Sequence, residues 1–133
     1  MSADQLNIDI LLYVAMAEEF DALSEALTED LKTELDVIEL ADLALHVFSV
    51  DVPSPALGKA VKLGIVPAGK MGIARAANVV SAVLDRSNCN DVVVLGIAGS
   101  LSADLQPGDV LIPDNVTEYL ANSAAINDAE IGY

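Results

Sequence analysis

The sequence predicts an α/β fold in which a partly parallel sheet is flanked by helices. Three observations carry this prediction: apolar runs of strand length, amphipathic or Ala-rich stretches of helical length between them, and small-residue turns where the runs end. In sheets of this kind, ligands bind at the carboxyl ends of the strands. The segments that follow the predicted strands are therefore the first places to search for a site.

The first half of the chain predicts a strand, a helix and a hairpin. Residues 8–14 form an apolar run that only Asp9 interrupts, which is typical of a buried strand. In residues 17–27, apolar side chains recur at helical spacing between acidic ones, which predicts a short amphipathic helix. Residues 43–52 and 60–66 predict two strands, and the Pro and Gly turn signals between them favour a hairpin.

The second half predicts a further helix and two further strands. A Gly-punctuated turn at residues 68–72 leads into an Ala- and Val-rich helix at residues 73–85. Residues 91–96 give the clearest pattern of a buried strand in the chain, and a turn rich in small residues at 97–100 closes it. Residues 109–113 predict another strand. No internal repeat or interdomain linker divides this pattern.

Composition and charge exclude several classes of protein. Hydrophobic residues make up 53% of the 133 positions, which is too many for a disordered segment. The formal net charge of −15 predicts no binding to nucleic acid or to a membrane, because phosphate recognition needs clustered cations. Cys89 is the sole cysteine, which favours a reducing compartment, and a cytoplasmic protein is expected. The sequence holds no metal-ligand spacing, so neither a metal nor another cofactor is expected.

Three segments, in this order, resemble the nucleoside phosphorylase/nucleosidase family. Residues 15–20 are similar to the opening of methylthioadenosine/S-adenosylhomocysteine nucleosidases, and residues 69–77 look like the family's Gly-containing turn into its second helix. The most specific match, residues 92–110, is a strand followed by Gly-Ile-Ala-Gly, a short loop, Gly-Asp and another strand. The resemblance implies a phosphorylase/hydrolase-like mixed sheet flanked by helices. It makes residues 1–133 a single N-terminal portion of that domain, incomplete relative to the family.

The chemistry that the resemblance implies is cleavage of the N-glycosidic bond of a purine nucleoside. An acid helps the base to leave, a carboxylate orients the sugar hydroxyls, and water or phosphate is held on the opposite face of the sugar. Glu19 matches the family glutamate that handles the nucleophilic water. The alternative interpretation is an ordinary glutamate at the start of a helix. If the match to the family is shifted by one residue, Glu18 is the corresponding acid.

Four further residues match positions where the family contacts its substrate. Met16 matches a methionine that lies against the ribose, and a core methionine at a strand end is the alternative. Ile97, Ala98 and Gly99 match the loop that contacts the ribose or the nucleophile. Nucleosidases commonly carry serine where Ile97 stands, so any contact there is expected through the backbone.

The resemblance favours the hydrolase branch of the family over the phosphorylase branch. Phosphorylases use arginines near the first helix and just before the Gly-x-Ala-Gly turn, where this chain holds acids and Leu95. Lys70 and Arg75 are the cations near the glycine turn. Solvated surface charges are the simpler explanation of both.

Two family motifs have no counterpart in this sequence: Met-Glu-x-Glu, which serves the ribose hydroxyls, and Ser-Asp, which protonates the purine. The chain by itself is therefore expected to be inactive. Three explanations stay open: a piece of a complete nucleosidase, a shortened relative that binds nucleosides or partners, or a chain that pairs with itself or another chain to cover an exposed sheet edge. A homo-oligomer and a purine nucleoside-type ligand are expected.

Overall fold

The structure of the protein, a computed structural model, describes residues 5–117. The chain divides into two compact units, residues 1–98 and residues 99–133. Within the described residues, the helices and strands all belong to the first unit. In chain order they are β1 (Ile10–Val14), α1 (Ala17–Leu31), β2 (Asp36–Leu40), the 3-10 turn η1 (Ala41–Leu43), β3 (Leu45–Ser54), β4 (Lys59–Pro67), α2 (Ile73–Leu84) and β5 (Asp91–Leu95).

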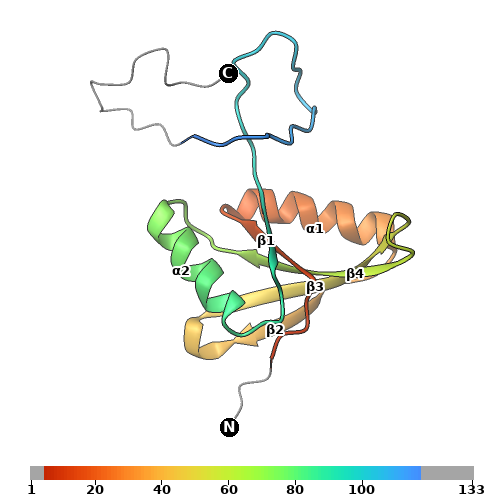
Figure 1. The fold of residues 1–133 in the computed structure, drawn as a ribbon, viewed down its shortest axis with the longest axis vertical. Coiled ribbons are helices and arrows are strands. Elements are labelled where there is room, and N and C mark those ends of the chain that lie inside the picture. Colours follow the sequence, from red (N-terminus) through yellow and green to blue (C-terminus); the bar gives the residue numbers. More distant parts are fainter. Residues whose placement is uncertain (1–4, 118–133) are drawn as a thin grey trace. The chain divides into compact units, whose positions relative to one another are not determined.

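A five-stranded mixed sheet forms the centre of the first unit, in the order β2-β3-β4-β1-β5. The central strand β1 runs parallel to both β4 and β5, whereas β3 is antiparallel to β2 and to β4. Figure 1 shows α1 and α2 flanking this sheet. The α/β fold class, the partly parallel sheet and the hairpin of β3 with β4 are therefore confirmed.

The two helices pack on opposite faces of the sheet because side chains alternate along β1. Leu11 and Tyr13 join one apolar cluster, to which α2 contributes Val79. Leu12 and Val14 join a second cluster, which the apolar side chains of α1 cover. Burial on both faces explains why the β1 segment is a continuous apolar run in the sequence.

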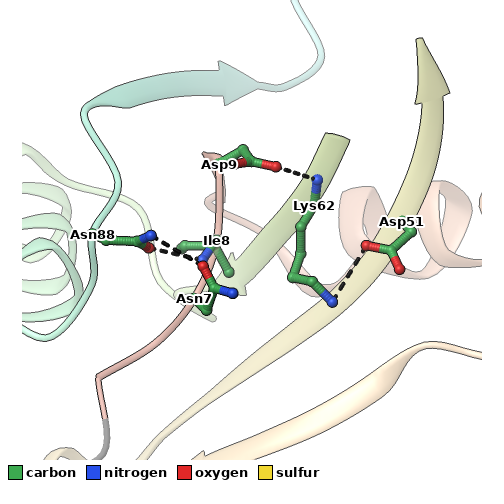
Figure 2. A network of polar contacts seen from close by, with 6 residues as sticks. All are labelled: Asn7, Ile8, Asp9, Asp51, Lys62 and Asn88. Carbon is green, nitrogen blue, oxygen red and sulfur yellow. Dashed lines mark hydrogen bonds and ion pairs between the residues drawn. The ribbon is translucent and has the colours of Figure 1, made fainter. Parts of the chain in front are cut away.

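Polar side chains hold the beginning of β1 in place, and Figure 2 shows their contacts. The backbone N–H of Asp9 donates to the Lys62 carbonyl, and the Asp9 carboxylate accepts from the Lys62 backbone N–H, each at 2.8 Å. The side-chain oxygen of Asn88 accepts from the Ile8 N–H at 3.1 Å, and its amide donates to Asn7 at 3.0 Å. Asp9, the one acid in the apolar run, thus extends the pairing of β1 with β4.

The predicted strand at residues 109–113 is wrong, because this segment forms no strand. In the second unit, the Asp109 carboxylate accepts from the N–H of Gln106 at 2.9 Å, and the Asp109 N–H donates to the Gln106 carbonyl at 3.0 Å. These bonds close a turn in which Gly108 has a φ of +97°, a value that favours glycine. An apolar run becomes a strand only when its backbone pairs with a neighbour, and the described part of this unit provides none.

The expected burial of residues 91–96 is also wrong, although β5 is a strand. All five side chains of β5 are exposed. The physical reason is that β5 is the last strand of the sheet and contributes no residue to either core cluster. The pattern of apolar residues in the sequence predicts a strand, but it does not predict where in the sheet that strand lies.

Two smaller differences concern the first half of the chain. Helix α1 continues to Leu31, beyond the predicted end at residue 27. Strand β2 is not predicted by the sequence pattern, because Asp36 and Glu39 interrupt its apolar residues. Pairing with β3 stabilises it as the other edge strand. Among the described residues, no helix has the length and apolar character needed to cross a membrane.

An ion pair connects the end of α2 with η1. The Arg86 guanidinium donates hydrogen bonds to both carboxylate oxygens of Asp42. These hydrogen bonds hold the pKa of Asp42 below its ordinary value. A lowered carboxyl pKa stabilises the fold above the unfolded-state pKa, and the contribution is lost as the pH falls through the folded-state pKa. Asp42 is exposed, so solvent screening keeps this contribution small.

Gly64 in β4 leaves no room for a side chain. A Cβ atom at this position would lie 2.7 Å from Cδ1 and 2.9 Å from Cγ2 of the buried Ile8. We expect Gly64→Ala to lower the free energy of unfolding by roughly 1–3 kcal/mol through overpacking, measured by urea denaturation. Gly99→Ala is the matched control, because nothing lies within 4 Å of a Cβ atom there. Equal unfolding midpoints for the two variants would contradict this expectation.

The hydroxyl of Tyr13 is buried and, in the described part of the chain, has no hydrogen-bond partner. Burying an unpaired hydroxyl costs about 1–3 kcal/mol. We expect Tyr13→Phe to raise the free energy of unfolding by about 1 kcal/mol, because the ring is kept and the cost disappears. Thermal and urea unfolding measure the change. A lower stability of the variant would mean that the hydroxyl has a partner in solution.

Candidate functional site

The candidate site lies at the carboxyl ends of the three parallel strands. The register pairs Val14, the last residue of β1, with Pro67 of β4 and with Leu95 of β5. The segments that follow these strands therefore begin at the same edge of the sheet. Ligands bind at this edge in α/β sheets, and the three segments are those that carry the family resemblance.

Glu19 links two of these strand ends through its carboxylate. Helix α1 begins immediately after β1, with Met16 as its N-cap residue and Glu19 in its first turn. One carboxylate oxygen, Oε2, accepts from the backbone N–H of Met16 at 3.2 Å. The other, Oε1, accepts from the backbone N–H of Ile97 at 3.0 Å. The Glu19 side chain thus connects the chain just after β1 with Ile97, which lies two residues beyond the end of β5.

The local sequence explains why an acid occupies this place. The first turn of a helix leaves backbone N–H groups without partners, and the positive end of the helix dipole favours a carboxylate there. Gly96 lets the chain pass close to Glu19, because a Cβ atom at residue 96 would lie 3.3 Å from Oε1. Glu19 is only 9% exposed, whereas its neighbour Glu18 is exposed. Of the two glutamates, Glu19 is therefore the one that lies within the site.

The remaining hydrogen-bonding capacity of Glu19 determines what it can do chemically. An ionised carboxylate has about four acceptor positions, and two of them are used by Met16 and Ile97. Among the described residues, no further hydrogen bond to this carboxylate is formed. The two backbone donors hold the carboxylate in a defined orientation, which is the preorganisation that a general base requires.

The structure brings together three of the five predicted site residues. Met16 and Ile97 meet Glu19 through their backbone N–H groups, and the Ile97 side chain is 78% exposed. The expected contact of residue 97 with a ligand through its backbone stays a prediction. Ala98 is the last residue of the first unit and Gly99 belongs to the second unit. The roles of all five residues in binding or catalysis stay predictions.

A cavity of about 310 Å³ lies beside the start of α1, and the sequence alone does not predict it. Its lining includes Phe20 of α1, Leu45 and Phe48 of β3, Pro67 of β4 and Arg75 of α2. Neither Met16, Glu19 nor Ile97 lines it, so the cavity adjoins the candidate site without containing its carboxylate. No sequence signal connects the first residues of β3 with α1, because their proximity depends on the antiparallel hairpin.

The cations near the glycine turn have different environments. The Arg75 guanidinium donates through Nε and Nη2 to the carbonyl of Ala68, at 3.4 and 3.2 Å, and so holds the turn that precedes α2. Lys70 is exposed. Within residues 5–117, no three His, Cys, Asp or Glu side chains gather to hold a metal ion.

The hydrogen bonds of Glu19 give a direct test of its place in the fold. In Glu19→Gln one oxygen becomes an NH₂ group, which cannot accept a hydrogen bond from a backbone N–H. We expect a loss of roughly 1–3 kcal/mol in the free energy of unfolding, measured by urea denaturation. Glu18→Gln is the matched control, because an exposed substitution changes stability by less than about 0.5 kcal/mol. If both variants unfold at the wild-type midpoint, Glu19 does not make these bonds in solution.

Comparison with known proteins agrees with the geometry. A family model described as the Phosphorylase superfamily matches residues 9–130, which is most of the chain. No curated protein and no solved structure gave a match. The matched region contains the central parallel strands, the glycine turn, Glu19 and the Gly96–Gly99 segment. The chain belongs to the phosphorylase superfamily, which comprises nucleoside phosphorylases and nucleosidases.

Proposed function

We propose that this chain forms the nucleophile side of a purine nucleosidase site, with Glu19 as the general base. One observation carries the proposal: the buried Glu19 carboxylate is held by the N–H groups of Met16 and Ile97 where β1 and β5 end. Superfamily membership supplies the class of chemistry, which concerns nucleosides. Purine specificity and hydrolysis are the parts that we propose.

In the proposed reaction, a free acceptor position of the Glu19 carboxylate binds a water molecule. The water oxygen attacks the anomeric carbon of the ribose as the bond to the purine nitrogen breaks. Glu19 accepts the proton that the water loses, and the leaving purine takes a proton from an acid. A carboxylate near the sugar also favours the positive charge that develops on the ribose in the transition state.

Water is the proposed nucleophile in place of phosphate because of the charges around the site. Phosphate binding needs cations or several convergent backbone N–H groups. The Arg75 guanidinium is engaged by the Ala68 carbonyl, and Glu18 and Glu19 both lie in the first turn of α1. A doubly charged anion would be repelled by these carboxylates, whereas a neutral water molecule is not.

The five proposed site residues divide into two roles. Glu19 orients and deprotonates the water. Met16 and the Ile97–Gly99 segment contact the ribose, the latter through its backbone, which the small residues Ala98 and Gly99 leave accessible. The proposed ligand is a purine nucleoside, the proposed compartment is the cytoplasm, and neither a metal nor another cofactor takes part.

A second function is favoured by the same hydrogen bonds. Because Glu19 caps α1 and fastens the end of β5, it also has a purely structural explanation. The alternative proposal is accordingly a non-catalytic module that retains a nucleoside pocket. The sequence lacks the Met-Glu-x-Glu and Ser-Asp motifs that the resemblance implies for ribose binding and purine protonation, which favours this alternative for the 133 residues by themselves.

Release of adenine from methylthioadenosine distinguishes an active nucleosidase from a non-catalytic module. We expect the 133-residue chain to release no adenine above the buffer control, measured by chromatography, because an acid for the purine is missing from it. In any longer natural reading frame that supplies the two motifs, we expect turnover, and Glu19→Gln should lower kcat by about 10²–10⁴-fold. Glu18→Gln is the control and should retain activity. Turnover that survives Glu19→Gln would remove the proposed base.

Nucleoside binding is measured separately by amide NMR on the 133-residue chain. Adenosine is expected to shift the amide resonances of Met16 and Ile97, since both lie at the proposed ribose site. Shifts that occur without turnover would support the binding module for this chain. If adenosine shifts neither resonance at millimolar concentration, the nucleoside pocket is contradicted.

A further inference from the structure

The cavity beside the start of α1 lies where the chain leaves two neighbouring strands in opposite directions. β1 and β4 are adjacent and parallel. The chain leaves β1 through α1 on one face of the sheet, and it leaves β4 through α2 on the other face (Figure 1). Ligands of α/β proteins bind in the crevice that such a divergence creates. The lining matches this position, because Ala17 begins α1, Pro67 ends β4 and Gly69 follows β4.

The first unit supplies the whole described lining of this cavity. The lining residues lie between positions 17 and 75, on α1, β3, β4, α2 and the turns beside them, and β5 contributes none of them. The volume of about 310 Å³ is at the lower end of the range for ligand pockets, which is roughly 300–1,000 Å³. A ligand with one or two rings therefore fits the cavity better than a larger molecule.

Aromatic side chains are concentrated around this cavity. The chain has two phenylalanines and one histidine, and all three of these residues, Phe20, His46 and Phe48, contribute to the lining. The ring centroids of Phe20 and Phe48 lie 4.6 Å apart, and those of His46 and Phe48 lie 6.5 Å apart. Both phenylalanines are only partly buried. Since aromatic rings pack well against one another in tilted or offset arrangements, this wall favours a flat aromatic ligand.

The charge of the lining is opposite to that of the chain as a whole. The sequence has 21 acidic residues and only six Lys and Arg. Within the described part of the chain, the lining nevertheless includes Arg75 and no Asp or Glu. No acid among residues 5–117 forms an ion pair with Arg75. The cavity therefore favours a ligand with negative charge over one with positive charge.

The hydrogen bonds of Arg75 determine which edge of its guanidinium can meet a ligand. Nε and Nη2 donate to the Ala68 carbonyl at 3.4 and 3.2 Å, which occupies one edge of the group. A guanidinium has five N–H groups, so Nη1 and the second N–H of Nη2 form another edge. Two parallel N–H groups of this kind match the two oxygens of a carboxylate. The bonds to Ala68 also hold the guanidinium in place, which lowers the entropy cost of binding.

We propose that this cavity binds a small aromatic carboxylate. The ring packs against Phe20 and Phe48, and the carboxylate accepts hydrogen bonds from Nη1 and Nη2 of Arg75. Inorganic phosphate matches the lining less well, because it has no apolar part to bury against the aromatic rings. An aromatic amine or another organic cation would meet Arg75 and find no acid in the described lining.

The proposed carboxylate site uses none of the residues of the proposed nucleosidase reaction. Met16, Glu19 and the Ile97–Gly99 segment do not line the cavity. Arg75 bonds to the turn after β4, whereas Glu19 bonds to the turn after β5. Binding of an aromatic carboxylate and hydrolysis of a nucleoside are therefore independent of each other, and each can fail without the other.

Amide NMR of the 133-residue chain during titration with 2-naphthoate tests the proposal. We expect millimolar 2-naphthoate to shift the resonances of Ala44 and Gly69, which line the cavity, and to leave that of Ile97 unchanged. 2-Naphthamide keeps the rings and loses the charge. It should bind at least about 10-fold more weakly, because charge-assisted hydrogen bonds are roughly twice as strong as neutral ones. Adenosine shifts at Met16 and Ile97 report separately on the nucleoside site.

Substitutions identify the groups that bind the carboxylate. Arg75→Met should raise the dissociation constant of 2-naphthoate by about 10-fold or more. Lys70→Met is the matched control, because it removes the same charge from an exposed residue that does not line the cavity, and it should leave the constant unchanged. Phe48→Leu keeps an apolar side chain without the ring and should raise the constant roughly 2- to 10-fold.

The comparison of 2-naphthoate with 2-naphthamide uses the wild-type chain, so it remains decisive even if Arg75→Met disturbs the turn after β4. The proposal is overturned if the acid and the amide bind equally well, or if Arg75→Met and Lys70→Met have equal effects. Absence of shifts at Ala44 and Gly69 at millimolar 2-naphthoate also overturns it. Inorganic phosphate that shifts these two resonances at lower concentration than 2-naphthoate would contradict the aromatic part of the proposal.

Discussion

The parallel pairing of β1 with β4 and β5 is the constraint on which the rest of the structure depends. Parallel strands deliver their carboxyl ends to one edge, so three segments that are far apart in the sequence start from neighbouring positions. The apolar residues of β1 make this possible, because they are buried on both faces under α1 and α2. The candidate site at the carboxyl ends of β1, β4 and β5 exists only because these strands are parallel.

Glu19 is a structural link at the candidate site and the base in the proposed reaction. Its carboxylate satisfies an N–H at the start of α1 and another N–H two residues beyond β5, so it fastens the edge where the strands end. The same two bonds orient the carboxylate and leave acceptor positions free. A group held in this way meets the geometric requirement for a base, and equally that for a helix cap.

The edge position of β5 sets a second constraint, which concerns burial. Within the described residues, the sheet is covered on both faces near β1, yet β5 lies outside both core clusters and pairs with β1 alone. Its apolar side chains are exposed for this reason. An apolar run of strand length is therefore buried only when other elements pack against it.

The sequence by itself determined the α/β class, the order of most elements, and the candidate acid. Runs such as residues 8–14 and 91–96 report strands because side-chain periodicity is local information, and Glu19 is found through a motif that is also local. Tertiary structure decided the rest. The place of β5 at an edge, the absence of a strand at residues 109–113 and the cavity beside α1 all depend on which backbone finds a partner. Backbone pairing joins residues that are distant in the chain, and no local pattern records it.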